Sequence, residues 1–204
     1  MSDRLGGPAP TDTAKADLHR YLQQGRDALL WKLDGLGEYD VRRPLTRTAT
    51  NLLGLVKHTA SVEAGYLGET FDRPFAEPLP WLDDDAVPNA DMWATPQESR
   101  EFIVELYRSV WANSDATIEQ FELDTMGTVP WWPTERATVS LHRVLVHVVA
   151  ETHRHAGHAD IVRELVDGRA GLRPVGDNMP AGVDEAWWAD YHATVENAAR
   201  SAAK

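Results

Sequence analysis

The stretch from Leu141 to Gly168 constrains the fold more than any other part of this 204-residue chain. Its apolar residues recur at spacings of three and four, which predicts a long amphipathic helix. At about 100° per residue, Glu151 and His155 fall on or beside the apolar stripe, one turn apart. A carboxylate and an imidazole are costly to bury without partners, so the pattern favours a divalent metal that binds both. The stretch holds five of the eight histidines: His142, His147, His153, His155 and His158.

The rest of the chain predicts further helices but no internal repeat and no convincing strand. Apolar spacing places helices at residues 12–36, 51–71 and 96–121, and Ser140 is the expected N-cap of the long helix described above. The third helix has the start pattern of Thr95 as N-cap, Pro96 at the first position and Glu98 at the third. A fifth helix is expected at residues 184–199, with Trp187, Trp188, Tyr191 and Val195 able to dock on the bundle or on a second subunit.

This order of elements predicts an all-α four-helix bundle with long inter-helix loops and an additional C-terminal helix. We expect a flexible N-terminus at residues 1–11, the bundle at residues 12–170 and a C-terminal extension at residues 171–204. The loop at residues 72–94 is long enough to be a lid or a pocket wall. In the loop at residues 124–139, Trp131 and Trp132 either line a pocket or cap the core, and the sequence favours neither.

Composition excludes several classes of function. A net charge of −12 argues against a nucleic-acid or anionic membrane surface, since both need clustered Lys and Arg. The chain has no run of about 18 apolar residues and no apolar segment near its N-terminus, so we expect a cytoplasmic protein. Without cysteine, it has no disulfide and no thiolate ligand, and thiol chemistry would need a thiol from outside.

A third metal ligand is available on the second predicted helix. His58 lies on its buried side, where a lone histidine is more often a core residue than a ligand. That reading changes only if another helix offers ligands opposite, as the Glu151–His155 pair does. Two imidazoles and a carboxylate suit Zn²⁺ with one position open, and the same set fits Fe²⁺.

Other histidines compete for these roles. His155 and His158 form a second plausible pair, and His147 lies near the edge of the same stripe. Pattern alone leaves both open as ligands. We expect the remaining histidines to be solvated: His19, His142, His153 and His192.

Two segments carry a resemblance to a known superfamily. NLLGLVKHTASVEAGYLGETF and the later SLHRVLVHVVAETHRHAGHADIVRELVDG resemble the DinB/YfiT-like metal-binding four-helix bundles over about residues 15–170. They look closest to the actinobacterial branch with mycothiol-dependent enzymes, such as mycothiol S-transferases and maleylpyruvate isomerase-like proteins. The resemblance implies a divalent metal, zinc before others, held by His58, Glu151 and His155. Many members have His where Glu151 stands, whereas relatives similar to thiol-dependent isomerases carry Glu there.

The function implied by this resemblance is a metal-dependent thiol transfer used in detoxification. Mycothiol or a similar small thiol would bind the open metal position, lose its proton and attack an electrophile. We expect no catalytic residue beyond the metal ligands. Trp131 and Tyr66 are the expected pocket residues, while Arg154 or Arg163 would bind a carboxylate; Arg163 fits a helix-packing ion pair first.

Two other functions and a homodimer also agree with the sequence. A metal-dependent hydrolase would use hydroxide in place of the thiolate. A non-catalytic, stress-related helical bundle would use the histidines only for packing. A homodimer is also compatible with the sequence, with the Trp187–Trp188 segment as its candidate interface.

Overall fold

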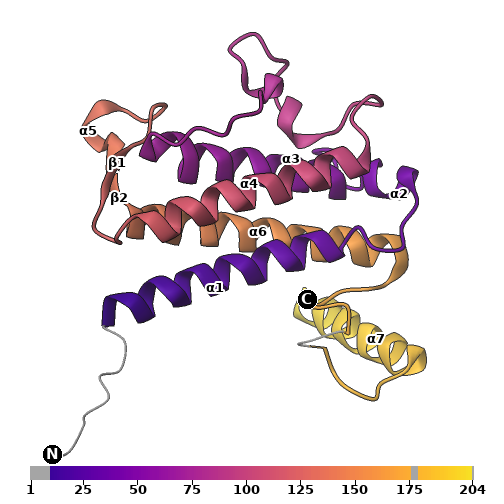
Figure 1. The fold of residues 1–204 in the computed structure, drawn as a ribbon. Helices are drawn as coiled ribbons and strands as arrows, with labels where there is room; N and C mark the ends of the chain where they lie inside the picture. The colour runs from indigo at the N-terminus through magenta and orange to yellow at the C-terminus, as the bar shows by residue number, and fades with distance from the viewer. Residues whose placement is uncertain (1–9, 176–178, 204) are drawn as a thin grey trace, which may run out of the picture.

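Four long helices run side by side in the computed structural model, which describes residues 10–175 and 179–203 (Figure 1). They are α1 (Pro10–Trp31), α3 (Leu52–Glu63), α4 (Arg100–Gln120) and α6 (Leu141–Asp167). Helix α6 packs against α1 and α3, and α3 packs against α4. The predicted all-α four-helix bundle is therefore confirmed.

Shorter elements connect and extend these helices. Helix α2 is Glu38–Arg42, and α3 continues as a π-helical turn, η1 (Ala64–Gly68), and a 3₁₀ turn, η2 (Glu69–Phe71). The long loop holds two more 3₁₀ turns, η3 (Pro80–Leu82) and η4 (Ala90–Met92). Helix α7 (Glu185–Ala202) is the expected C-terminal helix; it lies beside the bundle in Figure 1, and none of its residues is buried.

Most of the predicted helix ends coincide with observed caps. The side chains of Asn51, Ser140 and Asp184 accept hydrogen bonds from backbone N–H groups three residues on. Helix α6 ends where Gly168 takes a φ of +77°, a conformation that glycine adopts without steric cost. The flexible segment expected at residues 1–11 falls mostly on residues 1–9, outside the described part of the chain.

The predicted start of the third helix at Thr95 is wrong. Helix α4 begins at Arg100, with Ser99 as its N-cap, four residues later than the predicted Thr95; the Ser99 hydroxyl accepts a hydrogen bond from Phe102 N. Glu98 does accept a hydrogen bond from Thr95 N, at 2.6 Å, as a capping residue would. Its other carboxylate oxygen lies 2.8 Å from Lys57 Nζ, so this tertiary ion pair holds residues 95–98 in a separate turn.

The expectation of no strand is also wrong. Strand β1 (Met126–Thr128) pairs antiparallel with β2 (Thr138–Ser140), with Gly127 opposite Val139, and the one-turn helix α5 (Thr134–Ala137) lies between them. Three residues are too few for a visible alternation of apolar and polar side chains. The pair closes the loop before α6 and so determines where Trp131 and Trp132 lie.

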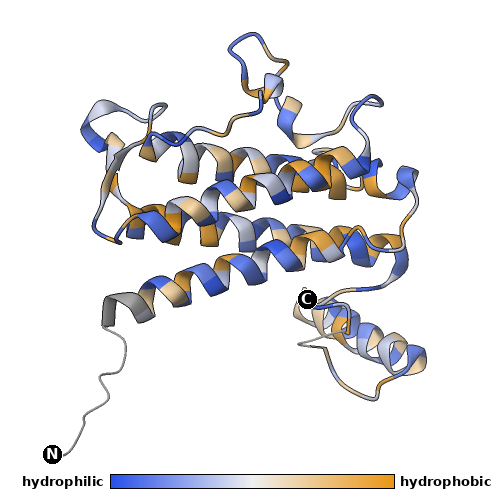
Figure 2. Ribbon diagram, in the orientation of Figure 1, coloured by the Kyte–Doolittle hydropathy of each residue, from blue (hydrophilic) through white to orange (hydrophobic). Residues whose placement is uncertain are grey.

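The bundle buries an apolar core with charged side chains inside it. Figure 2 shows hydrophobic and hydrophilic segments recurring along each long helix, as amphipathic packing requires. Leu55, Val56 and Ala159 belong to one buried cluster, and Leu145 and Val148 belong to a second. No helix among the described residues is long and apolar enough to cross a membrane.

Arg26 of α1 and Glu63 of α3 form a fully buried ion pair in this core. Two guanidinium nitrogens of Arg26 donate to the Glu63 carboxylate, and a third donates to Asp115 of α4 at 2.8 Å. His19 also lies 2.9 Å from Asp115, so it is not simply solvated as expected. Paired charges thus join three helices, with Arg26 and Glu63 fully buried and Asp115 half-buried.

We predict that Glu63→Ala lowers the free energy of unfolding by about 3–5 kcal/mol, because it leaves the buried Arg26 guanidinium without its main partner. Urea unfolding of the parent and the variant measures this. Glu105→Ala, at an exposed position of α4, is the control and is expected to stay within about 0.5 kcal/mol. Equal effects of the two substitutions would contradict the structural role of the pair.

Candidate functional site

Helices α3 and α6 bring the three predicted ligands together. The rings of His58 and His155 lie edge to face, with centroids 4.7 Å apart. His155 Nε2 lies 3.4 Å from Glu151 Oε2, one turn away on the same helix. His155 is buried, whereas Glu151 and His58 are half-buried. The α3–α6 packing therefore creates the histidine–carboxylate cluster that α6 alone only suggested.

Asp91 is a fourth member of this cluster that the sequence did not reveal. It lies in η4, and its Oδ2 is 2.6 Å from His58 Nδ1. Thirty-three residues separate the two in sequence. A single aspartate in a long acidic loop has no periodicity to distinguish it, so only the tertiary structure identifies it.

Two pKa shifts describe the electrostatics of the cluster. The hydrogen bond from His58 holds the pKa of Asp91 below its usual value, although partial burial opposes the shift. Burial, together with the nearby His58, lowers the pKa of His155 to about 4. His155 is therefore neutral at pH 7, which is the form of imidazole that binds metals.

The donor set fits a divalent metal in its chemistry. Two ligands about 2.0–2.1 Å from a tetrahedral zinc lie about 3.3 Å apart, close to the 3.4 Å between His155 Nε2 and Glu151 Oε2. His155 Nδ1 is also buried without a hydrogen-bond partner among the described residues. As the side chains stand, no three His, Asp or Glu residues in 10–175 and 179–203 already have an arrangement that could hold a metal.

A pocket of about 350 Å³ adjoins this cluster and includes Asp91 in its wall. Tyr66 lies in the π-helical turn η1. The centroid of its ring lies 5.1 Å from that of Trp131 and 4.5 Å from that of His147. Gly65 permits this contact, because a Cβ there would lie 2.7 Å from the Trp131 ring. The structure thus places Trp131 in a pocket wall together with Tyr66. The other lining residues are Ser61, Val62, Gly65, Glu69 and Leu82.

The two predicted arginines do not belong to this pocket. Arg154 is exposed, and Arg163 is buried between α6 and the end of α1. The Arg163 guanidinium donates to the carbonyl oxygens of Lys32 and Asp34 and to the Asp167 carboxylate. These contacts give Arg163 the helix-packing role that was weighed first for it.

The remaining histidines have varied surroundings. His158 is exposed, with its ring 5.4 Å from that of His155. His142 and His192 are exposed as expected. His153 is not simply solvated, because its Nε2 hydrogen-bonds to the carbonyl oxygen of Tyr21 at 2.9 Å.

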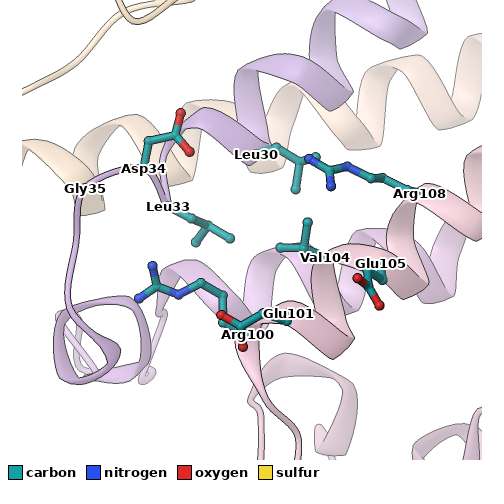
Figure 3. A pocket seen from close by; sticks show the side chains of 9 residues that line it. All are labelled: Leu30, Leu33, Asp34, Gly35, Arg100, Glu101, Val104, Glu105 and Arg108. Carbon is teal, nitrogen blue, oxygen red and sulfur yellow. The ribbon is translucent and has the colours of Figure 1, made fainter.

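Figure 3 shows a second cavity, of about 300 Å³, between the end of α1 and the first half of α4. Leu33 and Val104 form its apolar floor, and Arg100, Glu101 and Arg108 surround it. None of the residues that line it belongs to the histidine cluster. The chemistry of the molecule therefore points to the aromatic pocket that Asp91 lines and not to this one.

The turn that carries Asp91 is bound tightly to α3. Lys57, which is buried, donates from Nζ to the carbonyl oxygens of Ala90 and Trp93 at 2.9 and 3.1 Å. Asn51 Nδ2 donates to the carbonyl oxygen of Met92 at 3.0 Å. A Cβ on Gly54 would overlap that same oxygen. The loop is therefore a fixed wall of the site, held by α3 on both sides of Asp91.

A scan against protein families matches residues 17–168 to the family described as Mycothiol-S-transferase. The match covers α3, α4 and α6, α1 from residue 17 on, and every residue of the cluster. The chain belongs to the mycothiol-S-transferase family. This confirms the resemblance to the DinB/YfiT-like superfamily, and helix α7 lies beyond the part that matches.

A solved structure supports the fold of this family member. The crystal structure of a conserved protein from Enterococcus faecalis is similar to it with a TM-score of 0.52 and 16% identity, over 80% of this chain and 100% of that one. At this identity the likeness shows the fold alone. A search of curated proteins found no match.

For this mycothiol-S-transferase family member we predict opposite effects of two glycine substitutions. Gly54→Ala lowers the free energy of unfolding by about 1–3 kcal/mol, because the new methyl group forces the 90–93 turn away from α3. Gly157→Ala, in the middle of α6 with open space around it, raises it by about 0.5–1 kcal/mol. Urea unfolding of both variants measures the difference, and stabilisation by Gly54→Ala would contradict the tight contact.

Proposed function

We propose that this chain is a metal-dependent S-transferase that uses mycothiol or a similar small thiol. The observation that carries the proposal is the meeting of His155 and Glu151 with His58 across the α3–α6 interface. Membership of the mycothiol-S-transferase family supports the transfer of a thiol. The divalent metal, Zn²⁺ first, would be held by these three side chains.

The proposed ligand set leaves room for a substrate. Three protein ligands leave one position open on a tetrahedral ion, as in catalytic zinc sites. A divalent metal bound there supplies the positive charge that favours the thiolate form of a thiol near pH 7. Neutral His155 and the Glu151 carboxylate would provide the lone pairs, and His155 is itself buried.

The adjoining pocket indicates the class of electrophile. Tyr66, Trp131, Val62 and Leu82 give it an apolar wall, and Glu69 and Asp91 are the charged residues among those that line it. No Lys or Arg is among those lining residues of the described chain. Aromatic rings bind flat apolar groups, and two carboxylates repel anions. We therefore propose an uncharged, partly aromatic electrophile.

The proposed reaction joins the thiol sulfur to an electrophilic carbon of that molecule. The sulfur supplies the electron pair of the new C–S bond, and the leaving group departs with the pair of the bond that breaks. The thiol proton passes to solvent. Tyr66 and Trp131 hold the electrophile, so the chain's own task is orientation beside the bound thiol.

We predict about one divalent metal per chain in untagged protein, with much weaker retention in His58→Ala, Glu151→Gln and His155→Ala, since each removes a proposed ligand. Elemental mass spectrometry after zinc loading and dialysis measures the content. His192→Ala, exposed on α7, is the matched control and keeps the parental content. Full zinc content in His155→Ala would show that the ligands are assigned wrongly. A parent protein that takes up no zinc would favour the non-catalytic bundle, in which the histidines serve only for packing.

We also predict thiol-dependent conversion of 1-chloro-2,4-dinitrobenzene by the zinc-loaded protein, followed by absorbance with mycothiol as the thiol. Trp131→Ala lowers kcat/KM by about 10-fold or more, because one ring of the pocket wall is lost, while zinc content is unchanged. Trp187→Ala on α7 is the control and retains activity. Turnover of an ester without any thiol, in place of this reaction, would favour the hydrolase.

A further inference from the structure

The contact between Asp91 and His58 gives the loop a role in the metal centre. A carboxylate only accepts hydrogen bonds, so His58 Nδ1 carries the proton and donates it across 2.6 Å. In a neutral imidazole the lone pair then belongs to Nε2. The contact therefore selects one tautomer of His58 and leaves one defined nitrogen as donor toward a metal.

The position of Asp91 is imposed by the loop backbone and not by its own flexible side chain. Lys57 holds the carbonyl oxygens of Ala90 and Trp93, and Asn51 holds that of Met92. All these anchors belong to α3 or its N-cap, the element that carries His58. Asp91 and His58 are therefore fixed to the same rigid helix, with the hydrogen bond spanning the gap between helix and loop.

We infer that Asp91 is a positioning residue, which fixes the tautomer and ring orientation of His58 for metal binding. This inference rests on the metal centre of the proposed function. A carboxylate that receives the second N–H of a metal-binding histidine also makes the other nitrogen a stronger base. Asp91 also lines the aromatic pocket. The same side chain therefore contacts a proposed metal ligand and forms part of the proposed substrate pocket.

The test compares metal affinity in the full chain for Asp91→Asn, Asp91→Ala and the control Asp85→Asn, which alters an exposed aspartate of the same loop. Zinc competition with a chromophoric chelator gives the dissociation constants, and the visible spectrum of the Co²⁺-loaded protein reports ligand geometry. We expect Asp91→Ala to weaken zinc binding about 10- to 100-fold. Asp91→Asn, which still accepts the hydrogen bond without the charge, falls between it and the parent.

The Co²⁺ spectrum separates positioning from simple structural support. A shifted spectrum in Asp91→Ala, with the urea midpoint and the Asp85→Asn affinity unchanged, supports the inference. If Asp91→Ala kept the zinc affinity and the Co²⁺ spectrum of the parent, the positioning role of Asp91 would be overturned, although the proposed metal centre would not be. Complete loss of metal, equal to that of His155→Ala, would also overturn it, because Asp91 would then be a ligand itself. A parent that binds neither ion overturns the proposed metal centre and the inference with it.

Discussion

The packing of α3 against α6 is the interaction on which the candidate site depends. Leu55 and Val56 of α3 and Ala159 of α6 are fully buried in one cluster. Ala159 lies one turn beyond His155 on α6. Apolar contact therefore determines the distance between His58 and His155. The polar site is a consequence of how the hydrophobic faces fit together.

Charged side chains inside this bundle are paired with opposite charges or with carbonyl oxygens. Arg26 has Glu63 and Asp115, and Lys57 has Glu98 and two carbonyl oxygens. These pairs connect α1 to α3 and α4, and α3 to the loop before α4, and so help to fix the relative positions of these elements. His155 Nδ1 is buried with no hydrogen-bond partner among the described residues, as are the hydroxyl groups of Tyr107 and Ser114. Of these groups, His155 Nδ1 is the one that belongs to the histidine–carboxylate cluster.

The sequence predicted the parts of the structure that depend on local periodicity. The apolar spacing of 141–168 identified α6 and placed Glu151 and His155 together, and Asn51, Ser140 and Asp184 cap helices as their residue types suggest. The strands β1 and β2 were missed because three residues show no pattern, and the other failures involve partners distant in sequence. Glu98 pairs with Lys57 and not with a helix start, and Asp91 meets His58 only because α3 anchors its turn. No pattern within either segment contains that information.

The site therefore combines two parts with different physical origins. The proposed ligands come from bundle helices, whose positions follow from core packing and change little without loss of the fold. The pocket wall combines α3 and its π-helical continuation, which supply Val62 and Tyr66, with Trp131 beside the short strands and Asp91 in η4. Loops tolerate substitution better than cores do, so the loop part of the wall can vary while the proposed ligand set is kept. Asp91 limits that freedom, because a loop change that moves it also moves the hydrogen bond to His58.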